Sequence, residues 1–326
     1  MKRCFAIVTL GFLLMGCKES PTFYSNNFRA DVHVQLYDEH QYDFLWCLDS
    51  SGSMLPRRQY VRDNIQNFIN IMNTRKAVDY QMAVVTTDFF RDAGALIQTP
   101  SGVSVVKSTD VNPAGEFQMI VDNVSGSKTA FWEQCLESVY QAVNQHRADF
   151  SRTGVQLNVI VVSDEDDWSC KSNCYGPEPE HNVVWNPFPV SRYINFLSQV
   201  KANEGAQINV FPIVGVNATD CGVASVGSRY IDVASQLGGL SQSGSICPSS
   251  FQQSYEAIAH TVADRGVRFP LDRPSTGVGI SVYVDRVLIP NGDDGWVYEA
   301  TTNSIVFMSR VPAKNSVVEI TYNQTP

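Results

Sequence analysis

The chain has 326 residues, a formal net charge of −9 and a hydrophobic fraction of 44%. This length suits one large domain with a smaller one beside it, and the hydrophobic fraction is sufficient for a sizeable core. Because no basic stripe interrupts the acidic balance, the composition excludes nucleic acid as an expected partner.

The first 17 residues, MKRCFAIVTLGFLLMGC, have the features of an export signal. Two basic residues precede an apolar run that is too short to be a membrane-spanning helix. The ending LMGC resembles a bacterial lipobox, in which the cysteine becomes the lipidated first residue of the mature protein. We therefore predict a lipid anchor at Cys17, with an ordinary signal peptide as the alternative. Lys18 after the cysteine favours the outer membrane, and residues 18–40 are predicted to be a polar tether.

From residue 41 to 268, apolar runs alternate with helical patterns. Strands are predicted at 44–48, 80–88, 155–163 and 206–216, with a short edge strand within 101–108. Helices are predicted at 55–73, 116–124, 131–146, 191–204, 229–239 and 250–264. Strands that are apolar almost throughout are buried on both faces, and helices separate them along the chain. The pattern therefore predicts a Rossmann-like α/β domain, with a mostly parallel sheet flanked by helices.

After residue 268 no helical pattern remains. The stretches 277–290, 295–308 and 316–323 alternate between apolar and polar residues, and Pro, Gly, Asn and Asp separate them. This pattern predicts a small all-β, sandwich-like domain over residues 269–326.

Polar side chains follow the first buried strand in a pattern typical of a cation site. Asp49, Ser51 and Ser53 form a D-x-S-x-S sequence between the apolar FLWCL and an amphipathic helix. Alternate residues of an extended loop point the same way, so one carboxylate and two hydroxyls converge. Asp164 ends a second buried strand and is expected at the same edge of the sheet. Hard cations prefer oxygen ligands, so we predict Mg²⁺ here, with Mn²⁺ and Ca²⁺ as alternatives.

A third loop, VSGSKTAFWEQC, precedes the helix predicted at 131–146 and supplies further hydroxyls. Three oxygens of one loop cannot fill a six-coordinate shell, so Ser127 and Thr129 are both candidates for the remaining protein ligand. Few direct carboxylates leave the cation electron-poor, so that an open position can accept a carboxylate from a partner.

Residues 42–265 resemble a von Willebrand factor type A (VWA) domain with a metal-ion-dependent adhesion site (MIDAS), as in integrin I domains. The resemblance depends on DSSGSM after FLWCL and on VIVVSDEDD further along the chain. It implies Mg²⁺ at the top of the sheet, completed by an acidic residue of a protein ligand. Asp49, Ser51 and Ser53 match the first loop and Asp164 the last, while the second-loop position falls on Ser127 or Thr129. The sequence SDEDDWS and the β-rich tail look more like the family's bacterial lipoprotein branch.

Six cysteines remain outside the signal, and an even number in an exported chain predicts disulfides. Cys170 and Cys174 are close enough for a local loop, and Cys221 and Cys247 flank a region rich in Gly and Ser. The other two are either bonded or buried thiols. The candidates are Cys47, Cys135, Cys170, Cys174, Cys221 and Cys247.

These features together predict a lipid-anchored protein of the bacterial cell envelope, an outer-membrane lipoprotein on either the periplasmic or the surface face. It is expected to bind a protein ligand that presents Asp or Glu, with adhesion as the leading function. The alternative is a periplasmic assembly or scaffold protein that uses the same domain without adhesion. No enzyme is predicted, since Ser51 does not fit the G-x-S-x-G pattern of a nucleophile and the five His are scattered.

Overall fold

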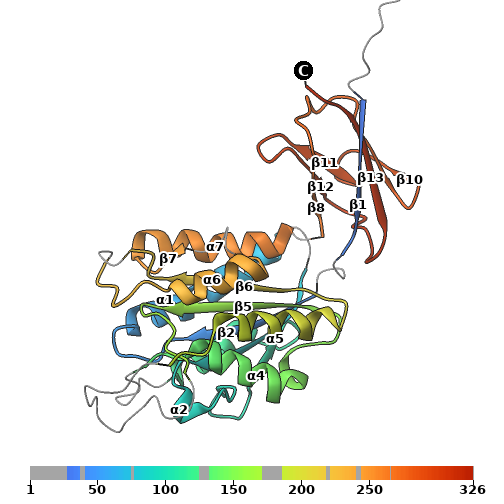
Figure 1. The fold of residues 1–326 in the computed structure, drawn as a ribbon. Helices are drawn as coiled ribbons and strands as arrows, with labels where there is room; N and C mark the ends of the chain where they lie inside the picture. The colour runs from blue at the N-terminus through green and yellow to red at the C-terminus, as the bar shows by residue number, and fades with distance from the viewer. Residues whose placement is uncertain are drawn as a thin grey trace, which may run out of the picture.

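The computed structural model describes residues 28–36, 41–74, 77–124, 132–170, 186–217, 221–239, 244–264 and 266–325. Within these residues the chain forms an α/β domain and a smaller β domain (Figure 1). The predicted signal and Cys17 lie outside the described residues. No helix in the described part of the chain is long and apolar enough to cross a bilayer.

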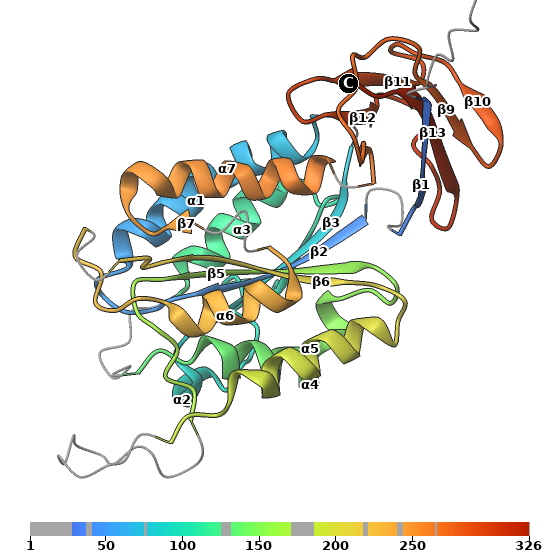
Figure 2. The same ribbon diagram turned by 45° about the horizontal axis from the view of Figure 1, so that its top comes forward.

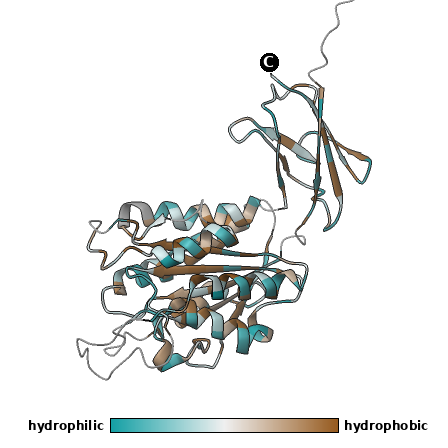
Figure 3. Cartoon of the chain, in the orientation of Figure 1, coloured by the Kyte–Doolittle hydropathy of each residue, from teal (hydrophilic) through white to brown (hydrophobic). Residues whose placement is uncertain are grey.

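A six-stranded sheet in the order β4-β3-β2-β5-β6-β7 forms the centre of the α/β domain. Its first three strands along the chain are β2 (Gln41–Leu48), β3 (Asp79–Thr86) and β4 (Val105–Lys107). The others are β5 (Gln156–Ser163), β6 (Ile208–Val214) and β7 (Gly244–Ser245). Of the described strands in this sheet, β4 alone pairs antiparallel, so the sheet is mixed and mostly parallel. The strands β5 and β6 are buried along their whole length, and Figure 3 shows the hydrophobic colour running along the centre of the domain.

Helices cover both faces of this sheet (Figure 2). One face packs against α1 (Leu55–Met72), α3 (Pro113–Asp122) and α7 (Pro248–Asp264). The other face packs against α4 (Cys135–Phe150), α5 (Val190–Ala202) and α6 (Ser228–Leu237). The short helix α2 (Phe89–Asp92) follows β3.

Alternation along β2 divides its side chains between these two cores. Trp46 faces the α1 layer, where its ring meets those of Phe68 and Phe117 edge to face, with centroids 5.4 Å apart in both pairs. Leu45 and Cys47 face the α4 layer. The strand is apolar on both sides because helices bury both sides, which is the physical basis of the predicted α/β pattern.

The β domain consists of two antiparallel sheets, of order β1-β13-β9-β10 and β11-β12-β8. Side chains from both sheets, including Val282, Ile305 and Ile320, form one buried core. The strands are β1 (Phe28–Val34), β8 (Arg268–Pro270), β9 (Ser281–Val284), β10 (Val287–Ile289), β11 (Trp296–Glu299), β12 (Ser304–Phe307) and β13 (Val317–Asn323).

The predicted tether over 18–40 is wrong for residues 28–34, which form β1. This strand pairs with β13 along its whole length, from Phe28 opposite Asn323 to Val34 opposite Val317. Asp31 is buried in the strand and accepts a hydrogen bond from the Asp272 amide at 2.8 Å. The β domain therefore contains both ends of the described chain. The predicted boundary after residue 268 falls inside β8, so the β domain begins no later than Arg268.

The two domains meet where the chain passes between them. Gln35 Nε2 donates to the carbonyl oxygens of Gly266 at 2.6 Å and Pro312 at 3.2 Å, which ties the two crossing segments together. Lys314 Nζ donates to the Gly154 carbonyl at 3.2 Å, directly across the junction. The β domain is thus attached to the end of the α/β domain at which β2 begins (Figure 1).

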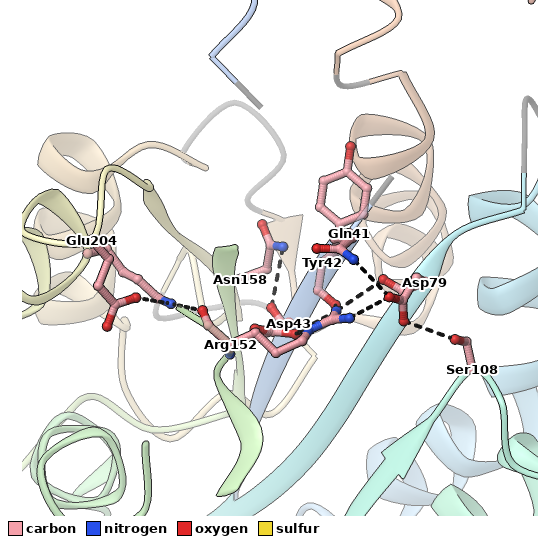
Figure 4. A network of polar contacts seen from close by, with 9 residues as sticks. Gln41, Tyr42, Asp43, Asp79, Ser108, Arg152, Asn158 and Glu204 are labelled. Atoms are coloured by element: carbon pink, nitrogen blue, oxygen red, sulfur yellow. Dashed lines mark hydrogen bonds and ion pairs between the residues drawn. The ribbon is translucent and has the colours of Figure 1, made fainter. Parts of the chain in front are cut away.

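A polar network lies at the amino ends of β2 and β3 (Figure 4). Arg152 donates through Nε to Asp43 at 2.8 Å and through Nη1 to Asp79 at 2.6 Å. The ammonium of Lys201, fully buried, donates to the Arg152 carbonyl and to Glu204, both at 2.9 Å. Burial raises the pKa of Asp43 from 3.8 to about 6, although Arg152 opposes the shift.

We predict that Asp43→Asn weakens the pH dependence of stability between about pH 4 and pH 7. Because the folded chain holds the Asp43 proton more tightly than the unfolded chain, this carboxyl stabilises most below pH 3.8. That contribution is lost as pH rises through about 6. Chemical denaturation of both proteins across this range measures the effect. Parallel curves for wild type and variant would contradict the assignment.

Candidate metal centre

Parallel pairing of β2 with β5 brings the two predicted acidic strand ends together. Leu48 lies opposite Val162, and the Asp49 amide donates to the Val162 carbonyl at 3.0 Å. Asp49 and Asp164 therefore follow neighbouring strands at the carboxyl edge of the sheet. Both side chains are buried, at 0% and 2% exposure, so neither carboxylate is a solvated surface group.

The oxygens of the D-x-S-x-S loop form a connected cluster with Asp164. Asp49 Oδ1 accepts a hydrogen bond from the Ser51 amide at 2.8 Å, which fixes the direction of the carboxylate. The hydroxyl oxygens of Ser51 and Ser53 lie 3.0 Å apart. Ser53 Oγ lies 3.3 Å from Asp164 Oδ1, which joins the loop to β5. The four side chains predicted from the two strand ends thus meet at one place.

The spacing of these oxygens suits a small hard cation. Neighbouring ligands of octahedral Mg²⁺, each about 2.0–2.1 Å from the ion, lie roughly 3 Å from each other. The Ser51–Ser53 and Ser53–Asp164 separations of 3.0 and 3.3 Å are close to this value. Carboxylate and hydroxyl oxygens are also the donor types that Mg²⁺ prefers. The residues present therefore fit the ion.

Two of the predicted ligands are not placed by the structure. Ser127 and Thr129 lie outside the described residues, so the second-loop ligand stays a prediction. Across the described ranges, no group of three or more His, Cys, Asp or Glu side chains is arranged to hold a metal ion. The candidate site is instead a mixed set of two carboxylates and two hydroxyls.

Buried carboxyl groups dominate the electrostatics of this edge. Burial raises the pKa of Asp49, and the neighbouring Asp164 adds to the shift. Burial also raises the pKa of Asp164. Burial and the proximity of Asp49 raise the pKa of Glu133 to about 9. Within the described residues no ion pair neutralises Asp49 or Asp164, so a cation would relieve the cost of burying both carboxylates.

Sequence reasoning missed Thr87 and Glu133, which connect a third strand end to this edge. The Thr87 hydroxyl donates to the Glu133 carboxylate, and the Thr87 carbonyl accepts from the Gln134 amide at 2.9 Å. The Thr87 amide in turn donates to the Leu48 carbonyl at 3.3 Å. A signal was present, because polar TTD follows the apolar YQMAVV of β3, as Ser-Asp follows β5.

The acidic residues after β5 have two different roles. Asp164 joins the hydroxyl cluster, whereas Asp167 Oδ1 accepts from the Leu136 amide at 2.9 Å in the first turn of α4. Arg229 Nε lies 3.1 Å from the other Asp167 oxygen. Asp167 is therefore a buried cap of α4 and not a further candidate ligand.

Two disulfides hold the loops around the site. Cys47, in β2, is bonded to Cys135, the first residue of α4, and Cys221 is bonded to Cys247 just before α7. The loop that contains Cys221 also contacts the site, since the amides of Ala224 and Ser225 donate to the Asp164 carbonyl at 3.0 and 3.2 Å. The predicted Cys170–Cys174 pair is not described, because Cys174 lies outside the described residues.

Comparison with known proteins finds similarity only among solved structures. No protein-family model matches the sequence, and no curated protein matches it. The pilus adhesin SpaC from Lactobacillus rhamnosus GG is similar in structure at 11% identity, with a TM-score of 0.43 over 91% of this chain. This chain spans 40% of the length of SpaC.

Two further solved structures belong to other pilus proteins. The vWF domain of the type V pili tip protein Mfa5 from Porphyromonas gingivalis is 13% identical, with a TM-score of 0.42, over 68% of this chain and 95% of that one. The PilB minor pilin from Streptococcus sanguinis is 10% identical, with a TM-score of 0.41, over 69% and 61% of the two chains. None of the three is described as an enzyme. Likeness at this level supports no functional inference.

We predict that removing the Cys47–Cys135 bond lowers stability more than removing the Cys221–Cys247 bond. The first closes a loop with a sequence separation of 88 and the second one of 26, so the first constrains the unfolded chain more. The double alanine variants are expected to lose about 4–5 and about 3–4 kcal/mol of unfolding free energy, respectively. Urea denaturation measures both values, and the reverse order would contradict the prediction.

Proposed function

We propose that the α/β domain is a VWA-type module that holds Mg²⁺ through Asp49, Ser51, Ser53 and Asp164 and binds a protein ligand there. The convergence of these oxygens from two neighbouring strand ends is the observation that supports it most directly. The bound ion would supply a Lewis-acidic position that accepts a carboxylate oxygen of an Asp or Glu on the ligand. Mn²⁺ and Ca²⁺ are the alternative ions.

The loop residues would give this ion an open side. Asp49 and Asp164 are buried, whereas Gly52 and Ser53 are exposed, so the hydroxyl side of the cluster faces outward. Leu55 is 60% exposed at the start of α1 and would form an apolar rim next to the ion. A site that combines an electropositive centre with an apolar rim suits an acidic residue flanked by apolar ones.

Adhesion at the bacterial surface is the version of this function that we favour. The lipid anchor at Cys17 and an outer-membrane location belong to the proposal and are supported by the sequence MKRCFAIVTLGFLLMGC. A protein held at the envelope and equipped with a cation-dependent binding site would attach its cell to an acidic partner. A periplasmic assembly or scaffold role would use the same site on the other side of the membrane.

We predict that Mg²⁺ raises the Tm of the wild-type protein and that Asp49→Ala and Ser53→Ala abolish the increase. A free Mg²⁺ concentration of about 100 times Kd stabilises the folded state by about 2.7 kcal/mol. Thermal unfolding with Mg²⁺ or with EDTA measures the shift. Ser50→Ala is the matched control, since its buried hydroxyl has no hydrogen-bond partner among the described residues and is not one of the proposed ligands.

The control separates loss of the ion from general damage to the loop. Ser50→Ala should keep the full Mg²⁺ response, while Ser53→Ala should fold normally in EDTA yet fail to respond. A wild-type Tm that is the same in Mg²⁺, Mn²⁺, Ca²⁺ and EDTA would refute the proposed site. An equal response in Ser53→Ala and wild type would remove Ser53 from it.

We predict that protease added to intact cells cleaves the protein, because adhesion requires exposure at the surface. A periplasmic scaffold would be digested only after the outer membrane is permeabilised. Immunoblotting of cells before and after permeabilisation distinguishes the two, with a known periplasmic protein as the internal standard. Protection on intact cells would leave the cation site in place but exclude the adhesion role.

A further inference from the structure

Arg58 is a buried cation next to the candidate metal centre that the proposed function does not use. It lies in the first turn of α1, is 4% exposed and donates its own amide to the Met54 carbonyl at 2.9 Å. Its Nη1 donates to two carbonyl oxygens of the D-x-S-x-S loop, those of Asp49 at 2.5 Å and Ser51 at 2.8 Å. A single guanidinium nitrogen thus spans the first half of the loop.

Arg58 donates to backbone carbonyls although buried carboxyl groups lie close to it. Asp49, Glu133 and Asp164 are all close enough to act electrostatically on Arg58. Even so, in the part of the chain that the structure describes, no ion pair joins Arg58 to any of them. An arginine paired with either aspartate would occupy the oxygens that a cation needs. Donation to backbone carbonyls leaves those oxygens available.

We propose that Arg58 is a positioning residue of the cation site, which holds the backbone carbonyls of Asp49 and Ser51 toward α1. With the carbonyls held in this way, the hydroxyls of Ser51 and Ser53 stay in contact with each other and with Asp164. Without this donor, the buried carbonyl of Asp49 would have no partner among the described residues, and that of Ser51 would keep only the Met54 amide at 3.3 Å, so the loop would relax to satisfy them. This inference rests on the proposed function, because it assigns Arg58 to the same site.

Arg57 provides a matched control within the same helical turn. It carries the same charge and also acts electrostatically on Asp164, but among the described residues its guanidinium makes only two long contacts, 3.5 Å to the Cys221 carbonyl and 3.8 Å to the Cys221 sulfur. Removing a positive charge near a cation site should by itself strengthen cation binding. Charge alone therefore predicts tighter binding for both Arg57→Gln and Arg58→Gln, whereas the positioning role predicts weaker binding for Arg58→Gln only.

The experiment is a Mn²⁺ titration of the full chain followed by electron paramagnetic resonance, with Tm in EDTA recorded for every variant. We expect Arg58→Gln to raise the Mn²⁺ Kd by roughly 10- to 100-fold. Arg57→Gln should bind as tightly as wild type or more tightly. Arg58→Lys should bind more tightly than Arg58→Gln, because an ammonium can also donate to both carbonyls.

The outcomes separate this inference from the proposed function. If the wild-type protein does not bind Mn²⁺, both the proposed cation site and the proposed role of Arg58 are refuted. If wild type binds and Arg58→Gln binds equally well, only the role of Arg58 is wrong. Should Arg58→Gln fail to fold, Arg58→Lys decides the question. Its Kd should lie within about threefold of wild type, and a folded variant that has lost Mn²⁺ binding would overturn the role.

Discussion

Parallel pairing between β2 and β5 is the constraint on which the candidate site depends. The register that places Leu48 opposite Val162 also ends both strands at the same level, so that the residues after them must share one edge of the sheet. Burial of both strands between helix layers prevents this register from slipping, because a shift by one residue would exchange side chains between the two cores and disrupt the packing of both. The proximity of Asp49 and Asp164 is thus a consequence of core packing rather than of any direct attraction between them.

The loops around this edge are held by several independent kinds of bond. Arg58 fastens the first loop to α1, the Cys47–Cys135 disulfide fastens the end of β2 to α4, and Asp167 caps that same helix from the segment after β5. A cluster of buried acids is costly, and these bonds keep Asp49 and Asp164 together although no ion pair within the described residues neutralises either of them. Preorganisation of this kind lowers the entropy lost when a ligand is bound.

Most of the fold could be predicted from the sequence, because its central strands and amphipathic helices have strong periodic patterns. The convergence of Asp49, Ser51, Ser53 and Asp164 was also predictable, since D-x-S-x-S and Ser-Asp follow two recognisable strands. β1 was not, because FRADVHV is polar enough to resemble a tether and becomes a strand only through pairing with β13, almost 300 residues away by the register of Phe28 with Asn323. Arg58 was missed for a similar reason: its partners are backbone carbonyls, which leave no mark in a sequence.

β1 precedes β2 along the chain, and this order determines how the molecule would respond to a pulling force. A load applied between the residues before Phe28 and the loop at Asp49 would run lengthwise along β1 and then along β2. Each strand would be loaded at its own two ends, so the tension would pass along its covalent backbone, which is already extended at about 3.3 Å per residue, and the hydrogen bonds to β13, β3 and β5 would stay in place. Force carried in this way unfolds neither domain, so a pull on the residues before Phe28 would leave the edge of the sheet at Asp49 intact.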